Sequence, residues 1–311
     1  MWNPKNIEKL VEYRLKKLSW LEISQKFSKL FNINVSPNNC RKAFYRKTRD
    51  DKESTPAKIL VFDIETSPME VYCWGLFDQN ISLDMIIKDW SVLSFSAKWI
   101  GSDKVMYQDT SKKADVRDDK DLIKSIWLLL NEADCVLTQN GKRFDVKKLN
   151  SRFLTHGFPP PSSYQHIDTL VISKKHFAET SNKLEYLTKK FCKKFKKSGH
   201  KQFPGFSLWK ECLAGNKKAW TEMQDYNKID VLSLEELYLD YLRPWDKTVN
   251  FNIYHDSTDY FCSCGSTSFN KNGFVYTNTA KYQRYTCNIC GAHHQDNQNL
   301  LSKEKRKSLR K

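Results

Sequence analysis

No long apolar stretch in this sequence of 311 residues suggests a membrane span. Residues 1–4 do not open a signal peptide, and the chain contains no internal repeats. These absences argue against a membrane protein and a secreted protein. We therefore expect a cytoplasmic protein that has no membrane partner.

Acidic residues are the minority among the charged residues, with 36 Asp and Glu against 52 Lys and Arg and a net charge of +16. This balance favours a polyanionic partner. The densest basic run lies in residues 189–201 and also contains Phe191 and Phe195. A solvated helix face is the ordinary explanation, but so many like charges repel one another unless a polyanion neutralises them. We expect nucleic-acid contacts from Lys193, Lys194 and Lys197.

Two carboxylates follow an apolar run in the middle of the chain. Residues 59–62 are continuously apolar, which predicts a buried central strand. Asp63 and Glu65 are two residues apart, so they project from the same face of that strand while Ile64 points to the other. Carboxylates this close repel each other unless a cation lies between them, and this suits a hard divalent ion.

Two further segments supply the other acidic residues. We expect a short strand over residues 134–138, a turn at Asn140-Gly141, and a helix from Phe144 that carries Asp145 in its first turn. The periodicity of residues 224–242 predicts a second helix. Tyr226 and Asp230 are four residues apart and share one face of it.

Each segment also has an ordinary interpretation. The first is a strand end with solvated charges, the second a helix start favoured by the macrodipole, and the third a polar helix face. Together they favour a site, because three unrelated elements deliver carboxylates and one of them adds a phenol.

The three segments resemble the three motifs of the DEDD, or DnaQ-like, 3′→5′ exonucleases, which have a ribonuclease-H-like fold. The Tyr-x-x-x-Asp pattern is that of the tyrosine subclass, beside the proofreading domains of family B DNA polymerases; the histidine subclass has His where Asp225 stands. The surrounding sequence is similar to stand-alone phage exonucleases, which implies the host cytoplasm if the chain is phage-encoded. The likeness covers residues 58–245 and implies an α/β fold, with a mixed sheet flanked by helices.

The resemblance implies two Mg²⁺ or Mn²⁺ ions, one orienting the attacking water and the other stabilising the departing 3′ oxygen. Their ligands would be Asp63, Glu65, Asp145 and Asp230.

The resemblance also implies roles for neighbouring side chains. Tyr226 would hydrogen-bond the attacking water and aim it, because a phenol is a poor base at neutral pH. Asn140 and Phe144 would contact the terminal nucleotides. We interpret Asp168 as a helix N-cap and not as a metal ligand.

The nine cysteines fall into two groups. Five are isolated, and we expect them to be reduced packing residues; they are Cys40, Cys73, Cys135, Cys192 and Cys212.

The other four form two short-spaced pairs, Cys262 with Cys264 and Cys287 with Cys290, each followed by glycine. This spacing predicts a few short strands closed by one tetrahedral Zn²⁺ and resembles the zinc ribbons of transposases. The first pair is Cys-x-Cys where Cys-x-x-Cys is usual, which leaves His293 or His294 as an alternative ligand. Two disulfides are the other interpretation.

The beginning of the chain predicts three short helices. Residues 7–18 are amphipathic, residues 19–22 form a capping box, and a third helix starts near Ser36. The third helix is basic, which resembles the recognition helix of a helix-turn-helix. A bare three-helix bundle has the same pattern. The expected DNA contacts are Arg41, Lys42 and Arg46.

The sequence thus predicts a helix-turn-helix-like module over residues 1–50, a nuclease domain over 58–245, a zinc ribbon over 256–298 and a basic tail over 299–311. We expect a metal-dependent 3′→5′ exonuclease that prefers single-stranded DNA ends, without a small-molecule cofactor. A replication or recombination protein is a candidate partner. An RNA 3′-exonuclease and a non-catalytic DNA-binding regulator are the alternatives.

Overall fold

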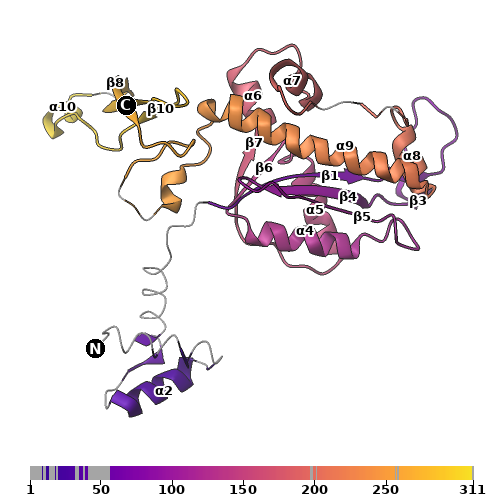
Figure 1. Ribbon diagram of the computed structural model, residues 1–311, viewed down its shortest axis with the longest axis horizontal. Helices are drawn as coiled ribbons and strands as arrows, with labels where there is room; N and C mark the ends of the chain where they lie inside the picture. The colour runs from indigo at the N-terminus through magenta and orange to yellow at the C-terminus, as the bar shows by residue number, and fades with distance from the viewer. Residues whose placement is uncertain are drawn as a thin grey trace. The chain divides into compact units, whose positions relative to one another are not determined.

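The computed structural model describes residues 9, 12, 13, 18, 20–31, 35–37, 39, 40, 57–196, 199, 200, 202–255, 257 and 259–309 (Figure 1). The chain divides into two compact units. One contains Met1–Pro56 with Ile253–Thr258, and the other contains Ala57–Asn252 with Asp259–Lys311. Within the described residues, no helix is long and apolar enough to cross a membrane.

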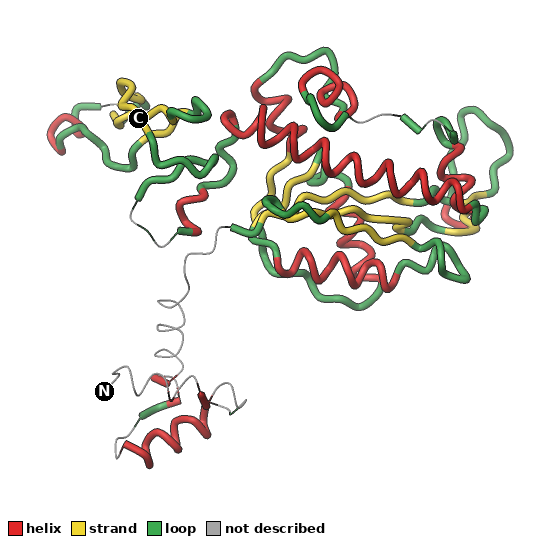
Figure 2. Tube along the Cα trace, in the orientation of Figure 1, coloured by secondary structure: helices red, strands yellow, loops and turns green. Residues whose placement is uncertain are grey.

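A five-stranded mixed sheet forms the centre of the second unit, in the order β5-β4-β1-β6-β7 (Figure 2). The central strand β1 pairs antiparallel with β4 and parallel with β6, and β6 pairs parallel with β7. The strands are β1 (Ile59–Thr66), β4 (Val92–Trp99), β5 (Val105–Asp109), β6 (Cys135–Thr138) and β7 (Gln165–Asp168). This confirms the expected mixed sheet and the buried central strand.

Helices cover both faces of the sheet. In Figure 1 the long helix α9 (Lys217–Glu236) crosses one face, and α4 (Lys120–Glu132) and α5 (Asp145–Thr155) lie on the other. A π-helical turn, η2 (Leu237–Leu242), continues α9. The remaining helices of this domain are α6 (Thr169–His176), α7 (Leu184–Phe191) and α8 (Ser207–Leu213).

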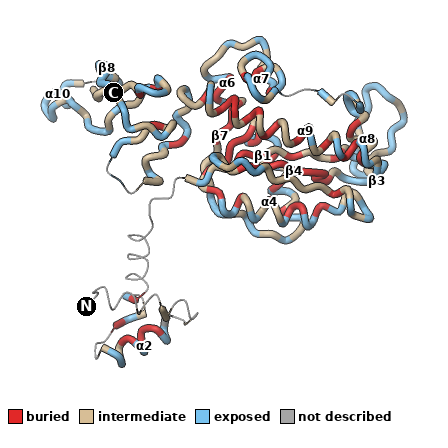
Figure 3. Tube along the Cα trace, in the orientation of Figure 1, coloured by how far each residue is buried: buried red, intermediate tan, exposed pale blue. Residues whose placement is uncertain are grey.

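The pleat of β1 directs alternate side chains to the two faces of the sheet. Leu60, Phe62 and Ile64 are buried in a cluster that also contains Leu122 and Ile126 of α4. The other face of the sheet has its own apolar cluster, in which Leu93 of β4 packs with residues of α8 and α9. Figure 3 shows the buried residues gathered on the strands and on the helix sides that face them. Asp63 and Glu65 alternate with the core residues and therefore point toward α9.

A tight loop leads from β6 into α5. Asn140 has a φ of 66°, and a Cβ added to Gly141 would lie 2.3 Å from Oγ1 of Thr138. Asp168 closes this loop, because its carboxylate accepts hydrogen bonds from the backbone N–H groups of Asn140 and Lys142 at 2.9 and 3.2 Å. It also accepts one from Leu170 N at 3.0 Å and caps α6, as the sequence predicted.

A second, smaller sheet lies in the carboxyl-terminal part of the chain, in the order β10-β9-β8. Its strands are β8 (Phe269–Tyr276), β9 (Lys281–Cys287) and β10 (His293–Gln295). The expected basic tail contains a short helix, α10 (Lys303–Lys307).

The first unit contains α2 (Trp20–Phe31), the second of the three helices expected there. Ile23 and Phe27 are buried in it against Val35 and Cys40. The capping-box residue Ser19 and the expected DNA contacts Arg41, Lys42 and Arg46 lie outside the described residues. The helix-turn-helix therefore stays a prediction.

Candidate active site

Three of the four predicted carboxylates lie together. Asp63, Glu65 and Asp230 each offer one oxygen atom, and these atoms all lie within 4.8 Å of one another. The first two come from β1 and the third from α9, which packs on β1 and β4. Asp230 is buried, whereas Asp63 and Glu65 are partly exposed. Such a set of oxygen donors can hold a hard divalent cation.

Small polar side chains of β4 line the same face of the sheet. Ser96 pairs with Asp63 and Ser94 with Glu65 across the two strands, and both serines are fully buried. Paired residues of adjacent strands point to the same face, so these hydroxyls lie beside the carboxylates. The alternation of serine with Phe95 and Ala97 is the sequence signal for this polar face.

Asn227 is a site residue that the sequence reasoning missed. Its Nδ2 donates a hydrogen bond to Oδ2 of Asp63 at 2.7 Å, and its Oδ1 accepts one from Oγ of Ser94 at 3.4 Å. Asn227 is fully buried, and these bonds fix the orientation of the Asp63 carboxylate. The signal was its place three residues before Asp230, which puts both residues on one side of α9.

Asp145 is adjacent to the cluster but is not a member of it. It lies in the first turn of α5, as predicted, although the helix begins at Asp145 and not at Phe144. Its Oδ1 accepts a hydrogen bond from Ile64 N at 3.3 Å. Ile64 lies between Asp63 and Glu65 in β1, so the carboxylate reaches the strand that carries the other ligands. Burial raises the pKa of Asp145 to about 7, although two backbone N–H groups partly offset this effect.

Tyr226 lies one helical turn before Asp230 and is held by aromatic neighbours. Its ring centroid is 4.7 Å from that of His200 and 6.3 Å from that of Trp209, both in edge-to-face geometry. Tyr226 lines a pocket of about 710 Å³ together with His200 and Asp225. The ring is therefore positioned by residues from two other segments, and the pocket gives it access to solvent.

An apolar pocket of about 480 Å³ lies beside Glu65. Phe144, Phe206 and Trp209 line it together with residues that follow β1. Phe144 is 40% exposed, so its ring is available to a ligand. Asn140, the other predicted contact of the terminal nucleotide, is partly buried in the loop that Asp168 closes.

Two carboxylates of α9 anchor the basic run and the two residues that follow it. Glu236 accepts hydrogen bonds from the backbone N–H groups of Lys193, Lys194 and Phe195, the shortest at 2.7 Å. Although burial opposes ionisation of Glu236, these bonds lower its pKa. Glu222 accepts two more, from Gln202 and Phe203.

The two anchors are 14 residues apart, so they lie about 21 Å apart along α9. The side chains of Lys193 and Lys194 are exposed, whereas Lys197 lies outside the described residues. His200, which contacts Tyr226, belongs to the same segment. Helix α9 therefore both holds the segment of the exposed lysines and carries residues of the candidate site.

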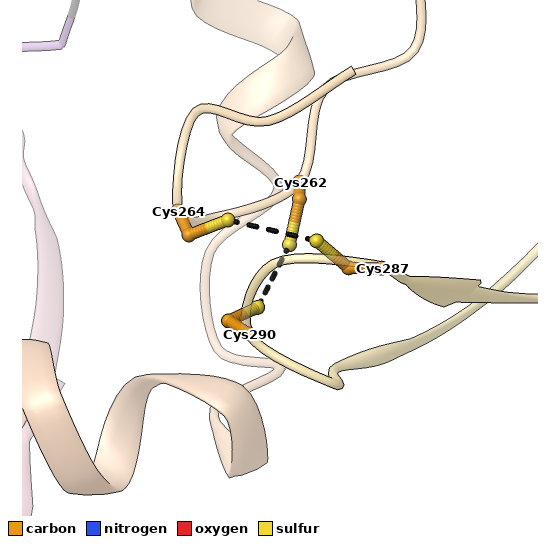
Figure 4. A group of neighbouring side chains, drawn as sticks. All are labelled: Cys262, Cys264, Cys287 and Cys290. Atoms are coloured by element: carbon orange, nitrogen blue, oxygen red, sulfur yellow. Dashed lines mark hydrogen bonds between the residues drawn. The ribbon is translucent and has the colours of Figure 1, made fainter. Parts of the chain in front are cut away.

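The four late cysteines converge, as Figure 4 shows. One sulfur atom from each lies within 4.8 Å of the others; Sγ of Cys262 is 3.4 Å from Sγ of Cys290, and Sγ of Cys264 is 3.7 Å from Sγ of Cys287. The glycines that follow the pairs, Gly265 and Gly291, have φ of 86° and 74°, which favours glycine. This arrangement can hold one tetrahedral metal ion.

The neighbouring histidines occupy different positions. His294 Nε2 lies 3.2 Å from Sγ of Cys262, whereas His293 Nδ1 lies 3.0 Å from Oγ1 of Thr286. Burial opposes ionisation of Cys287, but backbone N–H groups of Cys290 and Ile289 and the neighbouring thiols bring its pKa down to about 6. A thiolate is the form of cysteine that binds metal.

A comparison with protein-family models agrees with this fold. Residues 88–241 match the family model of the RNase_H superfamily, so the chain contains a domain of that superfamily. The match includes Asp145, Tyr226 and Asp230 but begins after β1. No curated protein matches the chain.

Among the solved structures, 118 chains match. One is the family B DNA polymerase from the hyperthermophilic archaeon Pyrobaculum calidifontis, with a TM-score of 0.45 and 16% sequence identity. The match covers 73% of this chain and 32% of the polymerase, so this chain aligns with about a third of that protein's length.

The raised pKa of Asp145 predicts a pH-dependent stability of the metal-free protein. Between about pH 4 and 7 the folded protein keeps a proton that the unfolded chain has lost, so stability falls as pH rises through this window. Asp145→Asn carries no charge and should escape this loss. In EDTA we expect the variant to exceed wild type by up to about 4 kcal/mol at pH 8 and to match it near pH 4.

Urea unfolding across this pH range measures the difference. Asp103→Asn, at an exposed position, is the control and should follow the wild-type curve. Equal stability of wild type and Asp145→Asn at every pH would mean that the buried carboxyl ionises without cost.

Proposed function

We propose that this chain is a metal-dependent 3′→5′ exonuclease that removes nucleotides from the 3′ ends of DNA, with a preference for single strands. The observation that carries the proposal is the cluster of Asp63, Glu65 and Asp230 beside Tyr226 in an RNase_H-superfamily domain. The 3′→5′ direction rests on the resemblance of the three motifs to DEDD exonucleases of the tyrosine subclass.

The donor set fits hard divalent cations. Asp63, Glu65 and Asp230 offer oxygen atoms only, and Asp145 reaches the same strand from α5. These four side chains would hold Mg²⁺ or Mn²⁺, which would lower the energy of the developing negative charge on the phosphate and on the departing oxygen. Asn227 would keep the Asp63 carboxylate in place before and during binding.

The reaction is hydrolysis of the last phosphodiester bond. Tyr226 would donate or accept a hydrogen bond at the attacking water and aim its oxygen at the phosphorus. The new bond joins that oxygen to phosphorus, and the bond from phosphorus to the 3′ oxygen breaks. A nucleoside 5′-monophosphate leaves, and the 3′ oxygen takes a proton and becomes the new terminal hydroxyl. His200 and Trp209 would hold the Tyr226 ring for this task.

Single-stranded DNA is the substrate that the surroundings favour. Phe144 in the pocket beside Glu65 can stack on a base only where that base is unpaired. Asn140 would contact the terminal nucleotide from the same loop. Lys193 and Lys194 are exposed on the segment anchored to α9, and Lys197 belongs to it; all three would contact phosphates.

The flanking modules would assist in binding. We infer a zinc ribbon in which Cys262, Cys264, Cys287 and Cys290 hold one Zn²⁺, and a helix-turn-helix that contacts DNA through Arg41, Lys42 and Arg46. Both would hold longer or duplex DNA while the end is trimmed. A replication or recombination protein is the partner class that this role implies.

Hydrolysis assays with end-labelled DNA and RNA, single- and double-stranded, test the function. We expect stepwise loss from DNA 3′ ends with Mg²⁺ or Mn²⁺ and none in EDTA. Asp63→Asn and Asp230→Asn should each lower the rate by about a thousandfold or more, because the cations contribute several kcal/mol to transition-state stabilisation.

Glu185→Gln, an exposed acid in the first turn of α7, is the control and should keep the wild-type rate. Stepwise degradation of RNA but not DNA would instead identify an RNA 3′-exonuclease. Strand binding without hydrolysis under all conditions would identify a DNA-binding regulator.

Tyr226→Phe separates chemistry from binding, because it removes only the hydroxyl group. We expect the single-turnover rate to fall about tenfold or more while affinity for single strands stays within about twofold. Tyr186→Phe, a tyrosine on α7, serves as the control. If affinity collapses and the rate holds, Tyr226 packs against the substrate and does not orient water.

Elemental analysis tests the ribbon. Purified protein should carry one tightly bound zinc per chain, and Cys287→Ser should lose it together with the folded β8–β10 sheet, because metal binding supplies most of the folding free energy of such modules. Cys73→Ser, an exposed isolated cysteine, should keep the zinc. Zinc retained in Cys287→Ser and lost in His294→Ala would overturn the assignment of the four cysteines.

A further inference from the structure

A loop that follows β1 and β2 presents large apolar side chains to solvent. Residues 72–83, which we call the aromatic loop, follow β2 (Glu70–Val71) and end at the first residue of η1 (Leu83–Met85). Trp74 is 92% exposed, Leu76 90% and Phe77 83%. Tyr72 and Leu83 are also exposed. Contiguous exposure of this kind marks an interaction surface in soluble proteins.

The base of the aromatic loop is held firmly although its tip is exposed. The guanidinium of Arg117 donates hydrogen bonds to Ser67 Oγ, to the carbonyl oxygens of Pro68 and Asp89, and to Glu70 Oε1, at 2.8–3.0 Å. In addition, β2 pairs with β3 (Ile86–Lys88), and Tyr72 N donates to Met85 O at 2.9 Å. A fixed base presents the exposed side chains in a defined place.

The aromatic loop continues directly from the candidate active site. Strand β1, which carries Asp63 and Glu65, ends at Thr66, and Ser67 and Pro68 line the same apolar pocket as Glu65. Phe206 and Trp209, at the start of α8, line this pocket too, and Figure 1 places β3 and α8 at the same end of the sheet. The aromatic loop and the pocket beside Glu65 therefore lie at the same end of the sheet.

The charges of the loop indicate what it binds. Residues 69–87 contain no Lys or Arg, and their three acids are Glu70, Asp78 and Asp84. Glu70 is paired with Arg117. Such a surface repels phosphates but accepts the flat, apolar faces of bases, since aromatic side chains stack on every base type.

We propose that the aromatic loop is a stacking platform for unpaired bases of the strand whose 3′ end occupies the candidate active site; the identity of this strand rests on the proposed function. Trp74, Phe77 and Tyr72 are the stacking side chains. Paired bases hide their faces in the duplex, so the platform selects single strands over duplex DNA.

Binding of an oligonucleotide of about 12 nucleotides, labelled at its 5′ end and measured in EDTA, tests the platform. The variant Trp74→Ala/Phe77→Ala should bind about tenfold or more weakly, while its thermal unfolding midpoint stays at the wild-type value, because both side chains are exposed. Leu154→Ala removes an equally exposed side chain from α5 and should bind like wild type.

Abasic strands identify the contact. Replacing consecutive bases upstream of the 3′ end by abasic sites should weaken wild-type binding by a similar factor and should weaken the double variant no further. The loss in the double variant should also be the same between about 50 and 200 mM salt, because no phosphate contact is removed. Lys193→Ala/Lys194→Ala should instead reduce the salt dependence of binding.

The proposal is overturned if the double variant binds the strand as tightly as wild type does. It is also overturned if the double substitution weakens binding of normal and abasic strands by the same factor. A shift from dimer to monomer in the double variant, with strand affinity intact, also overturns it and assigns the loop to a second copy of the chain. Because binding is measured in EDTA, the result does not depend on hydrolysis. A wild-type protein that binds strands through the loop but hydrolyses none would contradict the proposed function alone.

Discussion

The pleat of β1 is the constraint on which the arrangement of the central domain depends. Successive side chains of a strand point to opposite faces, so Leu60, Phe62 and Ile64 enter the core while Asp63 and Glu65 face α9. A shift of one residue would bring the two carboxylates into the apolar core and turn the core residues toward the polar face. The antiparallel pairing with β4 prevents this shift and also places Ser94 and Ser96 beside the carboxylates. Core packing and site geometry are therefore fixed by the same register.

Helix α9 acts as the second scaffold. Three of its residues, Tyr226, Asn227 and Asp230, belong to the candidate site. Three of its glutamates fix other segments. Glu236 holds the basic run, Glu222 holds the two residues that follow it, and Glu235 binds Lys98 of β4 at 2.6 Å in a largely buried ion pair. Moving the helix away from the sheet would separate this pair and leave a buried charge without its partner. The pair therefore opposes such a displacement. The helix that supplies the site residues is thus fixed against the strand that supplies the others.

The sequence predicted those features that local patterns encode. The buried strand before Asp63, the place of Asp145 in the first turn of a helix and the cap at Asp168 all follow from a few neighbouring residues. The structure adds contacts between distant segments, such as the bond from Asn227 to Asp63, the bond from Ile64 to Asp145 and the anchoring of the basic run by Glu236. No local pattern specifies these pairs, because each depends on how the helices dock on the sheet. Helix α9 also begins at Lys217, earlier than expected, because Asn216 caps it.

Phosphates and the carboxylate cluster repel each other when no cations are bound, so attraction for a nucleic acid has to come from elsewhere on the protein. Under the proposed function, the exposed lysines of the anchored segment would supply one source, which weakens with salt. Aromatic surfaces would supply another, which depends on exposed base faces and not on charge. Phe144 lines the pocket beside Glu65, and the aromatic loop presents further exposed rings after β2. Because stacking requires unpaired bases, the proposed platform would make the state of the strand, paired or unpaired, decide whether a 3′ end reaches the carboxylates.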